Sequence, residues 1–128
     1  MIHRCDKFFT AFEELRAGIF GKIDRGVEES NLKTATVKIE TNPSADNYLE
    51  RALSFYKLGE NKNASRDIKK MLELNNNYVP AYLLRGLTFD RNGKYEKAIS
   101  DFQKCKSITQ KVEFDFFIAI SERKQKKK

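Results

Sequence analysis

The fold is decided by two consecutive stretches, ADNYLERALSFYKLGENKNASRDIKKMLELNNNY at residues 45–78 and VPAYLLRGLTFDRNGKYEKAISDFQKCKSITQKV at residues 79–112. A step of 34 residues carries Ala64 onto Ala98. The same step carries the small residue Ala52 onto another small residue, Gly86. Self-similarity at this period is typical of stacked helical hairpins, because one hairpin cannot bury its own apolar face.

Each stretch is expected to form two helices joined by a turn. In residues 79–112, apolar residues recur three and four positions apart on both sides of Asn92-Gly93, which indicates two amphipathic helices. Residues 45–78 carry the same pattern around Gly59. Where the two helices pack closely, one must present a small residue, and a large side chain such as Phe102 fills the space beside it.

The flanking segments repeat this pattern less clearly. Towards the N-terminus, Gly18 and Ser30 continue the series of small residues, which predicts N-terminal helices with a degenerate first repeat in residues 1–44. Residues 34–40 alternate apolar and polar side chains as a strand would, but the repeat context favours a helix. Residues 113–128 continue a helical stripe that ends in lysines, so we expect a capping helix and a basic tail.

The second stretch resembles the tetratricopeptide repeat, whose signature places aromatic and small residues at fixed positions. The residues at those positions are Tyr82, Gly86, Phe89, Ala98 and Phe102, and the first stretch has Tyr48, Ala52, Phe55, Ala64 and Ile68 there. Four positions depart from the signature: Arg51 and Arg85 replace its Leu, and Asn76 and Gln110 replace its Pro. The resemblance implies an all-α fold, a right-handed superhelix of about three helical hairpins plus a C-terminal capping helix.

No arrangement of residues in the sequence indicates catalysis, a cofactor or a metal. The single histidine, His3, has no partner in a motif, and the glycines are too scattered to form a phosphate-binding loop. Cys5 and Cys105 lie far apart, and no metal-binding or disulfide framework is indicated. We therefore predict a protein that is not an enzyme, has no cofactor or metal, and keeps its thiols reduced in the cytoplasm. A cytoskeletal or ciliary assembly is one such setting, and no stretch is apolar enough to span a membrane.

The resemblance also implies where a partner would bind. In tetratricopeptide domains the first helices of the hairpins line a concave groove. The corresponding residues here are Leu49, Glu50, Leu53, Tyr56, Lys57, Leu83, Leu84, Leu87, Asp90 and Arg91. Such a groove, apolar at its floor and charged at its edge, suits a partner helix or an extended segment. The chain would then be an adaptor, or a subunit of a larger intracellular assembly.

Two alternatives leave no free groove. The chain's own N-terminal segment around Phe8, Phe9 and Phe12 could fill it, or the leucines could pack against neighbouring hairpins. One ligand class is not expected in either case. The family's carboxylate clamp grips the acidic tails of heat-shock chaperones with Lys, Asn and Arg. The matching positions hold Leu15, Ile19, Glu50, Pro80 and Leu84, or in a shifted register Leu49, Leu53, Leu84, Phe114 and Ile118. Neither set can bind a carboxylate, so we predict no binding of chaperone tails.

Positive charge is concentrated at the end of the chain. The net charge is +7, from 25 basic and 18 acidic residues. Within residues 122–128, one glutamate stands against five cations, Arg123, Lys124, Lys126, Lys127 and Lys128. As an alternative function, this basic tail predicts docking on an acidic polymer surface such as RNA, DNA or a microtubule. A solubilising tail without a ligand is the other interpretation.

Overall fold

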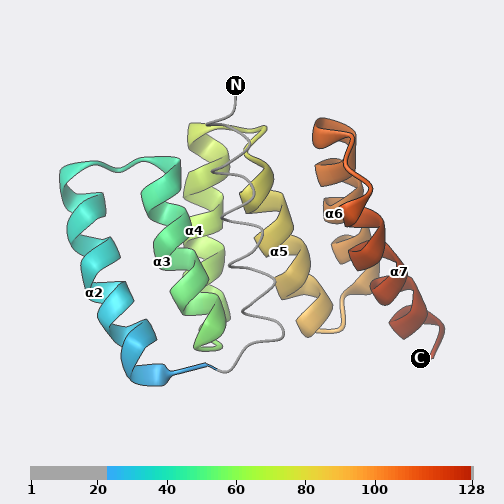
Figure 1. Ribbon diagram of the computed structural model, residues 1–128, viewed down its shortest axis with the longest axis horizontal. Helices are drawn as coiled ribbons and strands as arrows, with labels where there is room; N and C mark the ends of the chain where they lie inside the picture. Colours follow the sequence, from blue (N-terminus) through green and yellow to red (C-terminus); the bar gives the residue numbers. More distant parts are fainter. Residues whose placement is uncertain (1–22, 128) are drawn as a thin grey trace. The chain divides into compact units, whose positions relative to one another are not determined.

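The computed structural model describes residues 23–127, and in this range every regular element is an α-helix. The helices are α2 (Arg25–Thr41), α3 (Ala45–Lys57), α4 (Asn61–Leu74), α5 (Val79–Arg91), α6 (Tyr95–Thr109) and α7 (Glu113–Lys126) (Figure 1). The prediction of an all-α fold is therefore confirmed. The chain divides into two compact units, one ending at Pro80 and the other starting at Ala81, and each is described by itself.

The first unit contains α2, α3 and α4, and α3 packs against both of the other helices. Helix α2 begins after Asp24, whose carboxylate accepts a hydrogen bond from the backbone N–H of Val27 at 3.1 Å. This cap stabilises the start of a helix by accepting from an N–H that has no partner in the helix itself. The helix continues to Thr41, so residues 34–40 are helical, as the repeat context predicted.

The hairpin turns of the two units have the same geometry. Gly59 and Gly93 both have φ of +79°, a conformation that residues with a side chain rarely adopt. After each glycine, a backbone N–H returns to the first helix: Glu60 donates to Phe55 and Lys94 donates to Phe89, both at 2.8 Å. This is the Schellman arrangement that closes a helix end. The same turn geometry therefore recurs after 34 residues.

The predicted small positions lie where helices approach closely. Ala52, Ala64 and Ala98 have no exposed surface. At Gly86, an added Cβ would lie only 2.5 Å from Cε1 of Phe102, so α5 and α6 can pack at this spacing only with a glycine here. The series does not extend to α2, because Ser30 is exposed there. The buried residues of α2 are Glu28 and Ala35 instead.

An arginine and an aspartate clamp the two helices of each hairpin together. In the first unit, Nε and Nη2 of Arg51 donate to the two carboxylate oxygens of Asp67 at 2.9 and 2.8 Å. In the second unit, Arg85 makes the same two bonds to Asp101, at the same two distances. The hydrogen bond to the aspartate raises the pKa of each arginine. The replacement of the family's usual Leu by Arg is therefore matched by an aspartate on the second helix.

The clamp arginines also stack on aromatic residues. The guanidinium carbon of Arg85 lies 5.4 Å from the ring centre of Tyr82. That of Arg51 lies 5.8 Å from the ring of Tyr48 and 5.9 Å from that of Phe55. Cations are attracted to the faces of aromatic rings at such distances. Each arginine is thus fixed on one side by a carboxylate and on the other by a ring of its own helix.

Helix α7 completes the second unit and packs on α6. Phe114 and Phe117 are buried, and the Phe117 ring lies 5.4 Å from the ring of Phe102 in a tilted arrangement. The helix runs to Lys126, so most of the predicted basic tail is helical. No helix among the described residues has the length and apolarity needed to cross a bilayer.

We predict that Gly86→Ala destabilises the protein. The added methyl group meets a fully buried aromatic ring, and overpacking of this kind costs about 1–3 kcal/mol, beyond the gain in helix propensity. Gly26→Ala is the matched control, since its Cβ would make only an ordinary contact of 3.5 Å with Asp24. Chemical denaturation of both variants measures the two changes. A Gly86→Ala variant as stable as wild type would contradict the close-packing argument.

The clamp predicts an asymmetric double-mutant cycle at Arg85 and Asp101. The side chain of Asp101 is 7% exposed and that of Arg85 is 39% exposed. Arg85→Leu should therefore cost more, about 2–3 kcal/mol, because it leaves a buried carboxylate without its partner. Asp101→Leu should cost about 1 kcal/mol, because the guanidinium can still reach water. The double variant should be more stable than Arg85→Leu alone, as buried ion pairs are replaceable by apolar residues. Strictly additive free energies would show that the clamp does not couple the helices.

Candidate partner-binding surface

The predicted groove residues lie on α3 and α5, the first helices of the two hairpins. Their apolar members are deeply buried. Leu49, Leu53, Tyr56, Leu83, Leu84 and Leu87 are each between 0 and 7% exposed. A partner could reach these side chains only after the groups that cover them had moved. The alternative in which the segment around Phe8, Phe9 and Phe12 fills the groove concerns residues outside the described range.

In the first unit, the charged groove residues are bound by α2. Lys38 Nζ donates to Oε2 of Glu50 at 3.1 Å, and both side chains are about half exposed. Lys57 Nζ lies 3.7 Å from Oε2 of Glu28, whose other carboxylate oxygen accepts a hydrogen bond from Ser54 at 3.1 Å. Helix α2 therefore lies along the Glu50–Lys57 side of α3 and covers part of the predicted edge of the groove.

A second interaction in this unit involves the start of α3. The hydroxyl of Tyr78 donates a hydrogen bond to Oδ1 of Asp46, in the first turn of α3. Burial, together with this bond to a carboxylate, raises the pKa of Tyr78 well above its usual value. Tyr78 therefore stays protonated and holds the segment after α4 close to α3.

In the second unit, Asp90 is bound by α7. Its two carboxylate oxygens accept hydrogen bonds from Ser121 Oγ and Lys124 Nζ, both at 2.7 Å. Lys124 is therefore not part of a free tail, although it was predicted as one of its cations. Arg91, in the last turn of α5, is exposed and is the predicted groove residue of this unit most accessible to a partner.

The other cations at the chain end are divided between helix and terminus. Arg123 and Lys126 lie in the last turn of α7, and Lys127 follows it. All three are exposed, whereas Lys128 lies outside the described range. Cations at this end of a helix complement its dipole, so these residues have a structural role.

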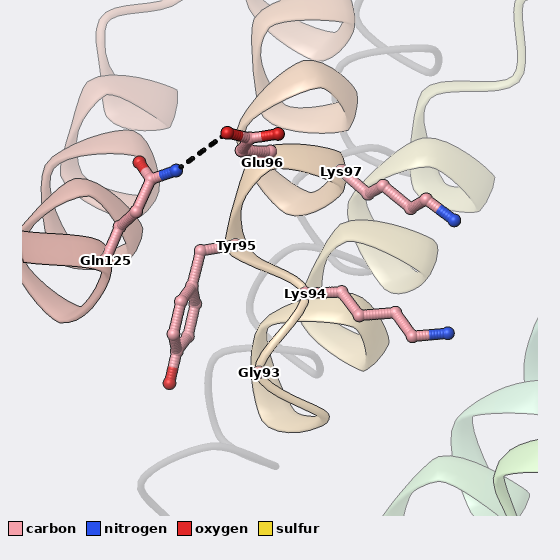
Figure 2. Close-up of a pocket in the computed structure, with 6 residues that line it drawn as sticks. All are labelled: Gly93, Lys94, Tyr95, Glu96, Lys97 and Gln125. Atoms are coloured by element: carbon pink, nitrogen blue, oxygen red, sulfur yellow. Dashed lines mark hydrogen bonds between the residues drawn. The ribbon is translucent and has the colours of Figure 1, made fainter. Parts of the chain in front are cut away.

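A surface hollow of about 300 Å³ lies at the start of α6 (Figure 2). It is lined by Gly93, Lys94, Tyr95, Glu96, Lys97 and Gln125. Gln125 donates a hydrogen bond to Glu96 at 3.3 Å. Figure 2 shows Lys94 and Lys97 pointing away from Tyr95, so the polar groups of the hollow do not converge on one point. This arrangement offers no paired acid and base for catalysis.

Cys105 occupies a position in the core of the second unit. Its side chain has no exposed surface, and burial raises the pKa of the thiol. A protonated, inaccessible thiol is a poor nucleophile and a poor metal ligand. Within residues 23–127, no group of His, Cys, Asp and Glu side chains is arranged to hold a metal ion.

Comparison with known proteins identifies the repeat. The tetratricopeptide repeat family model matches residues 79–111. Tetratricopeptide repeat protein 13 of Homo sapiens is 34% identical over 101 residues, which is 79% of this chain. The chain spans only 11% of the length of that relative. Repeats of this kind indicate a protein–protein interaction module, and proteins that carry them are generally non-catalytic scaffolds. The chain belongs to the tetratricopeptide repeat family.

Proposed function

We propose that this chain is a non-catalytic adaptor, or a subunit of a larger assembly, that binds a partner helix or extended segment along α3 and α5. The observation that carries the proposal is the equivalence of these two helices. Each is the first helix of a hairpin fixed by the same arginine–aspartate clamp and the same glycine turn. Within each hairpin, the clamp and the turn give the first helix the same local setting, so the two helices are suited to the same kind of ligand.

The burial of the leucines determines how such a partner would bind. Because Leu53 and Leu87 are 4 and 5% exposed, the partner must compete with contacts inside the chain that cover them. The apparent affinity would then be reduced by the small fraction of molecules in which the groove is open. The exposed side chains Glu50 and Arg91 would make the first contacts, which affect the rate of association and its specificity.

Chaperone tails remain excluded from this proposal. Pro80 and Leu84 stand, in one register, at positions of the family's carboxylate clamp for chaperone tails. Both residues are buried and apolar. The free thiol of Cys105 suits a reducing compartment, so we place the assembly in the cytoplasm, including its cytoskeletal or ciliary structures.

A second candidate function uses the basic chain end. Arg123, Lys126 and Lys127 are exposed together at the end of α7, and Lys128 follows them. These cations could dock on the acidic surface of RNA, DNA or a microtubule. Binding of about four phosphates would weaken with salt at a log–log slope of about −4. Lys124 would contribute little, since it is paired with Asp90.

The two functions are separated by affinity capture from cells with two charge variants. The groove variant carries Glu50→Lys and Arg91→Glu, both at exposed positions. The tail variant carries Lys126→Gln, Lys127→Gln and Lys128→Gln. We expect the groove variant to lose a captured protein at least about tenfold and the tail variant to keep it, also at high salt. Circular dichroism checks that both variants are as helical as wild type.

The opposite pattern would favour the second function. If the tail variant captures no partner, and if capture by the wild type disappears at high salt, the basic end is the binding site. If both variants capture the same proteins as wild type, the groove is not the binding site. Charges placed directly at Leu53 or Leu87 would be less informative, because these side chains are buried and the variants would test folding.

A further inference from the structure

An exposed seam runs along α7. Phe114, Phe117 and Ser121 form the buried side of this helix. The seam consists of Glu113, Phe116, Ile120 and Arg123. The ring of Phe116 is 50% exposed, Ile120 is partly exposed, and the two charged residues are exposed. Figure 1 shows α7 beside α6 in the second unit, and α7 also reaches α5 through the bonds of Ser121 and Lys124 to Asp90.

The spacing of the seam is that of a helix-pairing surface. Its residues follow one another at intervals of three, four and three positions. This is the heptad rhythm with which two helices pack along a common seam. The Phe116 ring packs edge-on against the ring of Phe117, with the ring centres 5.6 Å apart, and Phe116 is still 50% exposed.

The charges of the seam make it complementary to itself. Two charged residues of α7 outside the seam have partners, since Asp115 pairs with Lys106 and Lys124 with Asp90. Glu113 and Arg123 form no salt bridge with any residue in the described range. They stand at opposite ends of the seam, separated by about 15 Å along the helix axis. A seam with an acid at one end and a base at the other matches a second copy that runs in the opposite direction.

We propose that α7 binds α7 of a second copy of this chain in an antiparallel pair. The two-fold axis would pass near residue 118. Glu113 of each copy would then face Arg123 of the other, and Phe116 would face Ile120. A parallel pair is disfavoured, because it would place Glu113 beside Glu113 and Arg123 beside Arg123. One pair of short helices buries less surface than a standard interface. The dimer is therefore weak, and the fraction of chains in the dimer rises with the protein concentration.

The test is sedimentation equilibrium of the full chain at low ionic strength, from micromolar to millimolar concentrations. We expect the average mass of the wild type to rise towards twice the mass of one chain. Glu113→Arg and Arg123→Glu should each weaken association at least about tenfold, because each places like charges opposite one another at both ends. Glu122→Arg, on an exposed position outside the seam, is the matched control and should dimerise as wild type does.

A mixture of the two charge variants gives the sharpest readout. Each is expected to be monomeric alone, but together they restore an opposite-charge pair at both ends of the seam, so the mixture should dimerise. This outcome cannot result from misfolding of either variant. The proposal is overturned if the wild type stays monomeric over the whole range. It is also overturned if the reversals leave dimerisation unchanged, or if the mixture stays monomeric while the wild type dimerises.

Discussion

The arginine–aspartate clamp inside each hairpin is the interaction on which the rest of the structure depends. Asp67 and Asp101 are 3 and 5% exposed, so each carboxylate must have a partner where it lies. The planar guanidinium binds it through two parallel hydrogen bonds, which fixes direction as well as distance. If the two helices slid or rotated past one another, the buried carboxylate would lose its partner and remain charged in an apolar environment. Gly86 packs closely on Phe102 between the same two helices that Arg85 and Asp101 join.

Much of the fold follows from local patterns in the sequence. The period of 34 residues, the glycine turns and the small positions Ala52, Ala64 and Ala98 predicted the hairpins. These features depend on backbone geometry and residue size, which a single sequence displays directly. The clamp was less apparent, because Arg51 and Arg85 were treated as departures from the family signature. Asp67 and Asp101 repeat with the same step of 34 and could have indicated the pairing.

The parts that the sequence did not predict involve side chains that are far apart along the chain. Neither periodicity nor spacing indicates that Lys38 would bind Glu50, or that Lys124 would bind Asp90. These contacts change the predicted site, because they engage charges that were assigned to the groove edge and to the basic tail. Ser30 shows the limit of the repeat itself. Helix α2 turns Glu28 and Ala35 inward, and the buried Glu28 then interacts with Ser54 and Lys57 of α3.

Taken together, the hairpins provide rigid elements, and binding is left to the surfaces that they present. The first helices have a buried apolar side and a few exposed charges. Helix α7 has an exposed seam in which Glu113 and Arg123 stand at opposite ends.

Hydrogen–deuterium exchange of the chain, with and without its captured partner, shows directly whether the partner binds along α3 and α5. Peptides from residues 45–57 and 79–91, which cover these two helices, should exchange more slowly in the complex. Peptides from α4 should change little. Protection confined to residues 113–128 would instead place the binding site on α7 and the basic end of the chain, and binding along α3 and α5 would be ruled out.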